Sequence, residues 1–163
     1  MITKTPVPAD SLPYRPCVGI MLLSAEGRVF VGKRIDQTLE AWQMPQGGID
    51  PGESPNDALI REMDEEIGTR KGVILRENPE WLNYDLPPHL IGSALQGRYR
   101  GQTQKWFALR FAGNDSDINL KTAHPEFNEW KWVNASELPA LIVPFKREIY
   151  ARVIAAFADL TTR

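Results

Sequence analysis

Four carboxylates fall within residues 62–66 of the sequence, inside the segment REMDEEIG. On a helix, Glu62 faces Glu65 at i+3 and Glu66 at i+4, whereas Asp64 points to nearly the opposite side. Like charges at these spacings oppose helix formation by about 0.2–0.5 kcal/mol per pair. Because an ordinary acidic helix simply faces water, a chemical role for this strip requires further support.

The preceding loop and the chemistry of carboxylates both favour a bound divalent cation. The loop GGIDPGE is rich in glycine, so its backbone can approach a phosphate closely. Hard cations such as Mg²⁺ prefer oxygen ligands and usually keep several waters. A cation between Glu62, Glu65 and Glu66 would turn the repulsion that disfavours the metal-free helix into a contribution to binding.

An EF-hand loop is the obvious alternative for an acidic segment, and the spacing excludes it. Such a loop needs a bidentate Glu at its twelfth position. Counting from Asp50 as the first ligand places Arg61 there. The strip is therefore interpreted as a cation site on a helix.

The stretch GGIDPGESPNDALIREMDEEIGT, residues 47–69, resembles the Nudix box, G-x5-E-x7-R-E-U-x-E-E-x-G-U, in which U is a large apolar residue. The one departure is Thr69 at the last apolar position, where a side chain packs at the helix end and touches no metal. A chance match to so many fixed positions is improbable. The fixed positions are occupied by Gly47, Glu53, Arg61, Glu62, Met63, Glu65, Glu66 and Gly68.

The resemblance implies an α/β protein with the Nudix fold, a mixed β-sheet sandwiched between helices. It also implies hydrolysis of a nucleoside diphosphate linked to another group. By this analogy, Glu62, Glu65 and Glu66 hold Mg²⁺ or Mn²⁺, and Arg61 pairs with Glu53 to brace the loop against the helix. The implied structural residues of the motif are Gly47, Gly48, Glu53, Arg61 and Gly68.

Hydrolysis of a phosphoanhydride brings a nucleophile to a polyanion, which is why a metal is needed. Metal ions screen the phosphate charge, acidify the attacking water and orient it for in-line attack. A nearby carboxylate can accept the proton. The sequence leaves open whether Glu62, Glu65 or Glu66 does so.

Further segments extend the resemblance from residue 14 to residue 150 and, in order, are YRPCVGI, AWQMPQGGID, WLNYDLP, GQTQKWF, PEF and PFKREIY. Together they are similar to the subfamily of RNA pyrophosphohydrolases and dinucleoside polyphosphate hydrolases. The leading implied activity is an RNA 5′-pyrophosphohydrolase, which converts 5′-triphosphate ends to 5′-monophosphates. The alternative is asymmetric hydrolysis of diadenosine tetraphosphate to ATP and AMP. The intact helix carboxylates argue against a non-catalytic binding module.

The same resemblance implies roles for residues outside the box. Glu126 in PEF is implied as an additional metal ligand or base. Arg15, whose backbone is kept extended by the proline after it, is implied as a substrate contact. Base stacking on aromatic faces is worth about 1–3 kcal/mol per base. The implied phosphate contacts are Arg34, Lys105 and Lys146, and the implied stacking faces are Tyr84 and Phe145.

The helix that carries the strip has clear start and stop signals. Ser54 precedes Pro55 in the first helical position, and Gly68 is near the expected end. The apolar stripe on this helix recurs at i+4 and consists of Leu59, Met63 and Ile67.

Strands are expected on both sides of this helix. The runs CVGIMLL and VFVGKR, residues 17–23 and 28–34, predict a β-hairpin around the turn SAEGR. The segment 73–111 is typical of strands separated by loops, and 129–133 predicts another strand. From Ser136 the pattern becomes helical, with an amphipathic stripe of Ile149, Val153, Ile154, Phe157 and Leu160.

Length and composition predict a single domain over residues 1–163, with a flexible arm over 1–13. The formal net charge of −2 gives no global sign of a nucleic-acid binder. The one cysteine, Cys17, lies in an apolar run and is expected to be buried. No signal peptide or membrane-spanning stretch is evident, so a cytoplasmic protein without an obligate protein partner is expected.

Overall fold

The computed structural model describes residues 8–35 and 41–161. Within them, eight strands form one mixed sheet with the central order β3-β2-β1-β7-β5. The strands are β1 (Tyr14–Leu23), β2 (Val29–Arg34), β3 (Trp42–Gln43), β4 (Gln46–Gly48), β5 (Gly72–Glu77), β6 (Leu82–Asp85), β7 (Gly101–Phe111) and β8 (Phe127–Val133). The helices are α1 (Pro55–Ile67), α2 (Leu138–Leu141) and α3 (Arg147–Ala156).

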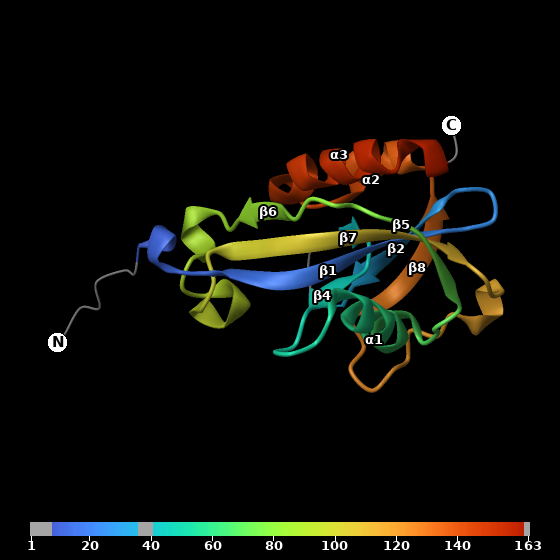
Figure 1. Cartoon of the computed structure of the whole chain (residues 1–163), viewed down its shortest axis with the longest axis horizontal. Coiled ribbons are helices and arrows are strands. Elements are labelled where there is room, and N and C mark those ends of the chain that lie inside the picture. Colours follow the sequence, from blue (N-terminus) through green and yellow to red (C-terminus); the bar gives the residue numbers. More distant parts are fainter. Residues whose placement is uncertain (1–7, 36–40, 162–163) are drawn as a thin grey trace.

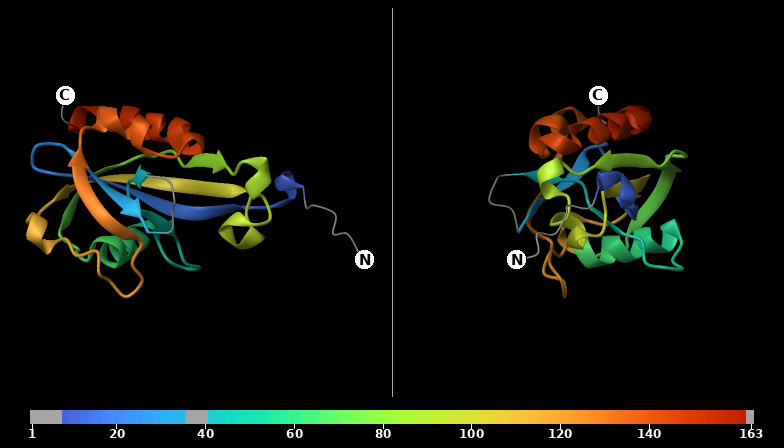
Figure 2. Two further views of the ribbon diagram at one scale, coloured as in Figure 1. Left: turned by 180° about the vertical axis from the view of Figure 1, so that it is seen from behind. Right: turned by 90° about the vertical axis from the view of Figure 1, so that its left-hand side faces the viewer.

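The helices cover opposite faces of the sheet. Helix α1 lies against one face, and α2 and α3 lie against the other (Figure 1). Figure 2 shows the same layers from behind and end-on. The predicted mixed sheet between helices is confirmed.

The two longest strands, β1 and β7, form the parallel centre of the sheet. They pair along the whole of β1, from Tyr14 opposite Gly101 to Leu23 opposite Arg110. The predicted β1–β2 hairpin is reduced to one pair, Leu23 with Val29, because β4 pairs with the middle of β1 instead. The edge of β1 is thus shared between β2 and β4, which the sequence pattern did not predict.

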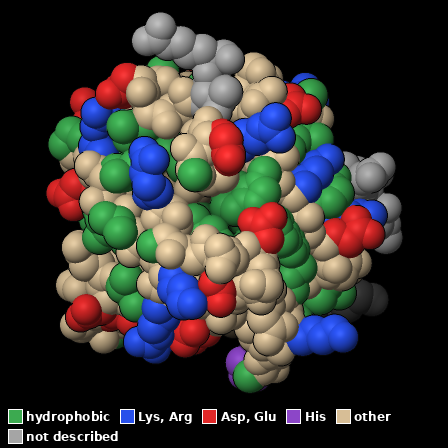
Figure 3. All heavy atoms as spheres, turned by 90° about the vertical axis from the view of Figure 1, so that its right-hand side faces the viewer, with side chains coloured by type: hydrophobic (Ala, Val, Ile, Leu, Met, Phe, Trp, Pro, Cys, Tyr) green, Lys and Arg blue, Asp and Glu red, His purple; other side chains and the backbone are tan. Residues whose placement is uncertain are grey.

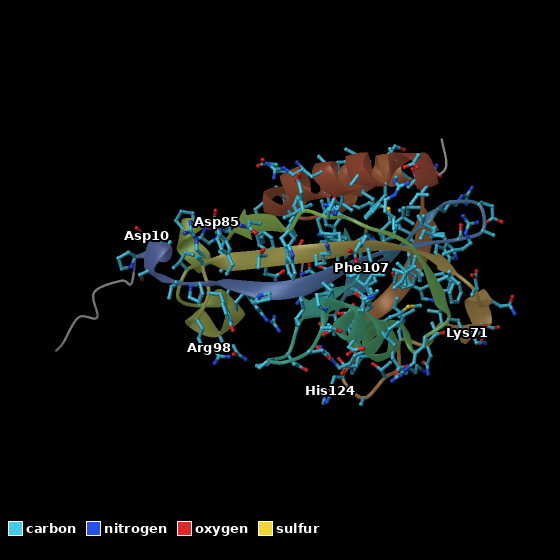
Figure 4. The ribbon with its side chains drawn as sticks, viewed as in Figure 1. Asp10, Lys71, Asp85, Arg98, Phe107 and His124 are labelled. Carbon is cyan, nitrogen blue, oxygen red and sulfur yellow. The ribbon has the colours of Figure 1, made fainter. Side chains whose placement is uncertain are left out.

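Each face of the sheet has its own apolar core. On the α3 side, Met21, Trp106 and Tyr150 belong to a buried cluster, and on the α1 side Leu59 and Phe107 belong to a second one. Phe107 is labelled in Figure 4. Because side chains alternate along a strand, β7 supplies residues to both clusters.

Helix α1 begins and ends as the sequence predicts. The Ser54 side chain accepts a hydrogen bond from the Asp57 backbone N–H at 3.1 Å, and Pro55 occupies the first turn. Gly68 ends the helix in the left-handed conformation, with φ 76°, and its N–H donates to Asp64 O at 3.0 Å. The predicted stripe of Leu59, Met63 and Ile67 is fully buried, and the buried face of the helix also includes Glu62 and Glu66.

The C-terminal helical region is interrupted rather than continuous. Helix α2 ends at Leu141, and α3 starts at Arg147 after an extended Ile142 and a 3₁₀ turn over Pro144–Lys146. Proline removes a backbone donor and opposes a continuous helix.

The expected N-terminal arm lies partly outside the described residues, which begin at residue 8. Ala9–Ser11 form a 3₁₀ turn, and the Arg100 N–H donates to Pro13 O at 3.0 Å. The described part of this segment is therefore attached to the molecule. At the end shown in Figure 3, basic and acidic side chains alternate with hydrophobic ones, in keeping with the small net charge.

Candidate active site

A cavity of ≈ 260 Å³ gathers carboxylates from two parts of the chain. Helix α1 contributes Glu62, Glu65 and Glu66. Glu126 lies in the loop, immediately before β8. The Ile35 N–H donates to Glu126 O at 3.0 Å and fixes this residue beside the end of β2. The structure thus places the four acids implied as metal ligands around one cavity.

Two of these carboxylates are buried on the sheet-facing side of α1. Glu62 is 8% exposed and Glu66 is 6% exposed. Burial raises the pKa of Glu62 to about 7 against the lowering effect of Arg61, and Glu65 adds repulsion. Burial, followed by repulsion from Glu62 and Glu126, raises the pKa of Glu66 well above its usual range. Without a cation, the cavity therefore disfavours the charged form of both groups.

The cavity fits a cation through an unsatisfied buried oxygen and a close backbone approach. Glu66 Oε2 is buried without a hydrogen-bond partner, which is costly unless a ligand completes it. A Cβ on Gly47 would overlap the Glu62 carboxylate as it is placed here, so the glycine lets β4 lie directly against that carboxylate. Divalent cations favour oxygen ligands of this kind.

Arg61 binds two of the carboxylates that line the cavity. Its Nη1 donates to Glu62 Oε1 at 2.9 Å and to Glu65 Oε2 at 3.1 Å. Within residues 8–35 and 41–161, no three carboxylate, imidazole or thiol groups converge as a ligand set. The guanidinium neutralises part of the negative charge of Glu62 and Glu65.

Arg61 also connects the loop to the helix, as the motif implies. It donates two hydrogen bonds of 2.9 Å to the two oxygens of Glu53. Its Nη2 also donates to Gly48 O at 2.8 Å. Hydrogen bonding from Arg61, together with the Asp50 N–H, lowers the pKa of Glu53 to about 2. The pair therefore stays charged and fixes β4 and the following loop on α1.

Arg15 and Arg34 line the same cavity as the carboxylates. Both favour the charged form of a buried acid, Arg15 for Glu62 and Arg34 for Glu66. A Cβ on Gly48 would overlap the Arg15 guanidinium, so the glycine makes room for this side chain. Positive charge beside a carboxylate cavity is suited to a polyphosphate bridged by metal.

The two predicted stacking residues lie together in a neighbouring cavity of ≈ 380 Å³. The rings of Tyr84 and Phe145 are 6.0 Å apart and inclined at 49°. Phe145 is 39% exposed, whereas Tyr84 is 8% exposed, so Phe145 offers most of the accessible aromatic face. Lys146 is buried, with its Nζ 5.6 Å from the Tyr84 ring centroid. It therefore packs against the aromatic pair and does not line the carboxylate cavity.

Lys105 is not brought to the carboxylates. It lies on β7 with its Nζ 3.6 Å from Glu77 Oε1 and is absent from the residues that line the cavity. The alternation along β7 places it on the same face as Phe107, whereas Gln102, Gln104 and Trp106 point to the other face. The implied phosphate contact is therefore not supported by this geometry.

Three glutamines that the sequence reasoning assigned no role line the carboxylate cavity: Gln43, Gln46 and Gln102. Gln43 and Gln102 are 8% and 4% exposed. The only sequence signal was in GQTQKWF, where Gln102 and Gln104 recur at i+2 within an expected strand, whereas Gln43 and Gln46 are three positions apart in AWQMPQGG. Neutral side chains carry no charge pattern, so only the tertiary structure showed where they lie.

Comparison with known proteins agrees with this fold. The NUDIX domain model matches residues 13–153. The RNA pyrophosphohydrolase of Rhodospirillum rubrum is 58% identical over 97% of this chain and 95% of its own length. That of Brucella anthropi is 53% identical over 96% of this chain and 97% of its own length.

Solved structures share the fold at low sequence identity. The E. coli dihydroneopterin triphosphate pyrophosphohydrolase has a TM-score of 0.65 and 19% identity, with 88% of this chain and 98% of that chain covered. A C. elegans Ap4A hydrolase has a TM-score of 0.61 and 17% identity over the same shares.

The protein has a mixed sheet, a helix that carries carboxylates and a glycine-rich loop before that helix. Together with the family match, these features identify a hydrolase of phosphoanhydride bonds. The chain belongs to the Nudix family. Nudix hydrolases generally use divalent metal ions. Among the described residues, no helix is long and apolar enough to cross a membrane.

Proposed function

We propose that this protein is an RNA 5′-pyrophosphohydrolase that converts 5′-triphosphate ends to 5′-monophosphates. The observation that carries the proposal is the 58% identity to the R. rubrum RNA pyrophosphohydrolase over nearly the full length of both chains. The relatives from Brucella anthropi and Rickettsia canadensis, at 53% and 54% identity, have the same name. A cytoplasmic location, where such RNA is made, is part of the same proposal.

The metal proposed for this site is Mg²⁺ or Mn²⁺, held by Glu62, Glu65, Glu66 and Glu126. When bound, it screens phosphate charge and activates water for in-line attack. The buried Glu66 Oε2, which has no hydrogen-bond partner, supports this assignment. A dication would also favour the charged form of these carboxylates, so Glu62 and Glu66 would lose on binding it the protons that burial otherwise retains.

The chain's own residues would bind and orient the substrate. Arg15 and Arg34 supply positive charge to the phosphates in the carboxylate cavity. The adjoining cavity takes a base against Phe145, where Tyr84 and Lys146 support the ring from behind. The two cavities are separate, which suits a nucleotide whose base and polyphosphate point in different directions.

Diadenosine tetraphosphate hydrolysis is the less favoured activity. Its support is the likeness to a C. elegans Ap4A hydrolase at 17% identity, a level that shows the fold alone. Both substrates present a base, a ribose and a polyphosphate, so shared turnover at different rates is compatible with the site.

The deciding experiment compares kcat/KM on triphosphorylated RNA and on diadenosine tetraphosphate, both in Mg²⁺. We expect the higher value for RNA, with monophosphorylated RNA as the product. Glu66→Gln keeps the shape of the site but removes a negative charge, and should lower kcat by at least about 100-fold. A higher kcat/KM on the dinucleotide, or near-normal RNA turnover by Glu66→Gln, would contradict the proposal.

A further inference from the structure

A buried chain of side-chain hydrogen bonds runs from the core to the carboxylate cavity. Trp106 Nε1 donates to Gln104 Oε1 at 2.8 Å. Gln104 Nε2 then donates at 2.8 Å to Gln46 Oε1 and at 2.8 Å to Gln102 Oε1. Trp106 is fully buried and Gln104 is 1% exposed, so water cannot readily replace these partners.

The chemistry of the indole fixes the direction of every bond in this chain. An indole N–H can only donate, so the Gln104 atom that faces Trp106 must be the carbonyl oxygen. The other end of Gln104 is then its NH₂ group, which can only donate. The atoms of Gln46 and Gln102 that face it must therefore be oxygens. This assignment follows from the identity of Trp106 and does not depend on how amide orientations are chosen.

The same logic determines what Gln102 presents to the substrate. Its oxygen faces Gln104 and accepts from it, so the end of the amide that points the other way and is left for a ligand is the Nε2 donor. Gln102 lines the carboxylate cavity and lies in register between Arg15 on β1 and Tyr84 on β6. A donor beside Arg15 is suited to an anionic oxygen and unsuited to a group that itself donates.

The second branch reaches the carboxylates through the backbone. Gln46 is bound by Gln104 at its side chain, and its backbone N–H donates to Glu66. Trp106 is thus connected by the same branched chain to a substrate-facing donor and to a metal-facing acid.

We propose that Gln102 is a further substrate-binding residue whose Nε2 donates to a phosphate oxygen, and that Trp106 and Gln104 are positioning residues that lock its amide in the donating orientation. The proposal rests on the proposed hydrolysis of a 5′-polyphosphate. The hydrogen bond from Gln102 to the phosphate would then depend on the indole N–H of Trp106 in the core. Trp106 lies two residues beyond Gln104 on the same face of β7.

The first test removes the donor and keeps the length of the side chain. Gln102→Met should lower kcat/KM on triphosphorylated RNA by about 10- to 100-fold, as expected for a hydrogen bond to a charged partner. Melting temperature should change little. Unchanged kcat/KM in a Gln102→Met variant, while the wild type cleaves RNA, would overturn the inference and leave the proposed function intact.

The second test addresses the lock itself. Gln104→Glu still accepts from Trp106 but, as a carboxylate, accepts from Gln46 and Gln102 as well. This forces both amides to reverse, so that Gln102 presents oxygen to the substrate. A fall in kcat/KM comparable to that of Gln102→Met is expected, and the three donors around the carboxylate should preserve the fold.

A double-mutant cycle separates amide orientation from added charge or lost packing. In a Gln102→Met background no amide remains to be turned at position 102, so Gln104→Glu should then lower kcat/KM by less than about 3-fold.

Trp106→Phe should behave in the same way as Gln104→Glu in the two backgrounds. Trp132→Phe is its matched control, because Trp132 Nε1 donates to Asp115 Oδ1 at 3.0 Å outside the cavity. Equal losses in both backgrounds would show that Gln104 and Trp106 act through structure or charge alone. Absence of RNA turnover by the wild type would instead contradict the proposed function.

Discussion

Glu62 and Glu66 are two carboxylates whose burial is unfavourable to their charged form unless a cation is bound. Both lie on the buried face of α1, where a charged carboxylate loses its water. Glu65, one position from Glu66, is 53% exposed at its side chain and bonds to Arg61. The strip is therefore two buried acids and one solvated acid, and the buried pair gains most from a cation.

The raised pKa of Glu62 predicts a stability that depends on pH in metal-free protein. The folded state retains this proton up to about pH 7, whereas the unfolded chain releases it near 4.5. Between these values the folded state binds more protons, so the free energy of unfolding falls as pH rises. The stability that the Glu62 proton gives the folded state is complete below pH 4.5 and lost above pH 7. It amounts to roughly 3 kcal/mol in the free energy of unfolding. Urea unfolding in EDTA across this range would measure it.

Glu62→Gln supplies the control for that measurement. It removes the titrating proton, so the fall between pH 4.5 and 7 should be clearly smaller than in the wild type. Glu148→Gln, at a side chain that is 85% exposed, should leave the fall unchanged. An identical pH dependence in Glu62→Gln and wild type would assign the effect to other groups.

At the scale of elements, the site depends on the joint between β4 and α1. Strand β4 is three residues long and is placed by its pairing with β1 and by Arg61. The planar guanidinium binds both oxygens of Glu53 and the carbonyl of Gly48 at once, which an ammonium group cannot do. The joint therefore requires arginine itself, and positive charge alone is not sufficient.

Arg61→Lys tests this joint. We expect a loss of about 1–3 kcal/mol in the free energy of unfolding, because hydrogen bonds to partly buried acceptors are lost. Activity should fall as well, since the Gly47–Gly48 backbone moves relative to Glu62. Denaturant unfolding and RNA turnover measure the two effects.

Arg70→Lys is the matched control for that substitution. Arg70 lies just beyond the same helix, is 66% exposed at its side chain and contacts Asp64 at 3.3 Å. An exposed pair of this kind contributes little, so its loss should change stability by less than about 1 kcal/mol. Similar losses in both variants would refute the special role of Arg61.

At the scale of the whole molecule, the carboxylate cavity combines residues from β1, β2, β3, β4, α1 and β7 with the residue just before β8. Segments so far apart in sequence meet there only in the folded state. A metal that binds this cavity therefore binds folded protein and leaves the unfolded chain unaffected, which stabilises the fold by mass action.

Adding Mg²⁺ or Mn²⁺ to EDTA-treated protein should raise its melting temperature. At 100 times the dissociation constant, the stabilisation is about 2.7 kcal/mol. Glu66→Gln should bind the ion more weakly and show a smaller rise at the same concentration. Differential scanning calorimetry in Ca²⁺-free buffer provides the measurement. A melting temperature that neither ion changes would show that these ions do not bind in this cavity.

The sequence by itself determined the family, the helix with its caps, and the acids that this helix carries. These features are local: Ser54, Gly68 and the i+4 stripe act within a few residues, and the motif has fixed spacing. The implied pairing of Arg61 with Glu53 also depends on this short range, and the structure contains it.

Only the tertiary structure decided which distant residues join the acids. The pattern of β7 could not show that Lys105 faces away while Gln102 faces the cavity, because the choice of face depends on how β7 pairs with β1 and β6. It could not show that β1 is shared between β2 and β4, since strand pairing is non-local. The direction of the hydrogen bonds from Trp106 through Gln104 to Gln102 is likewise fixed only once packing excludes water and leaves these side chains to bind one another.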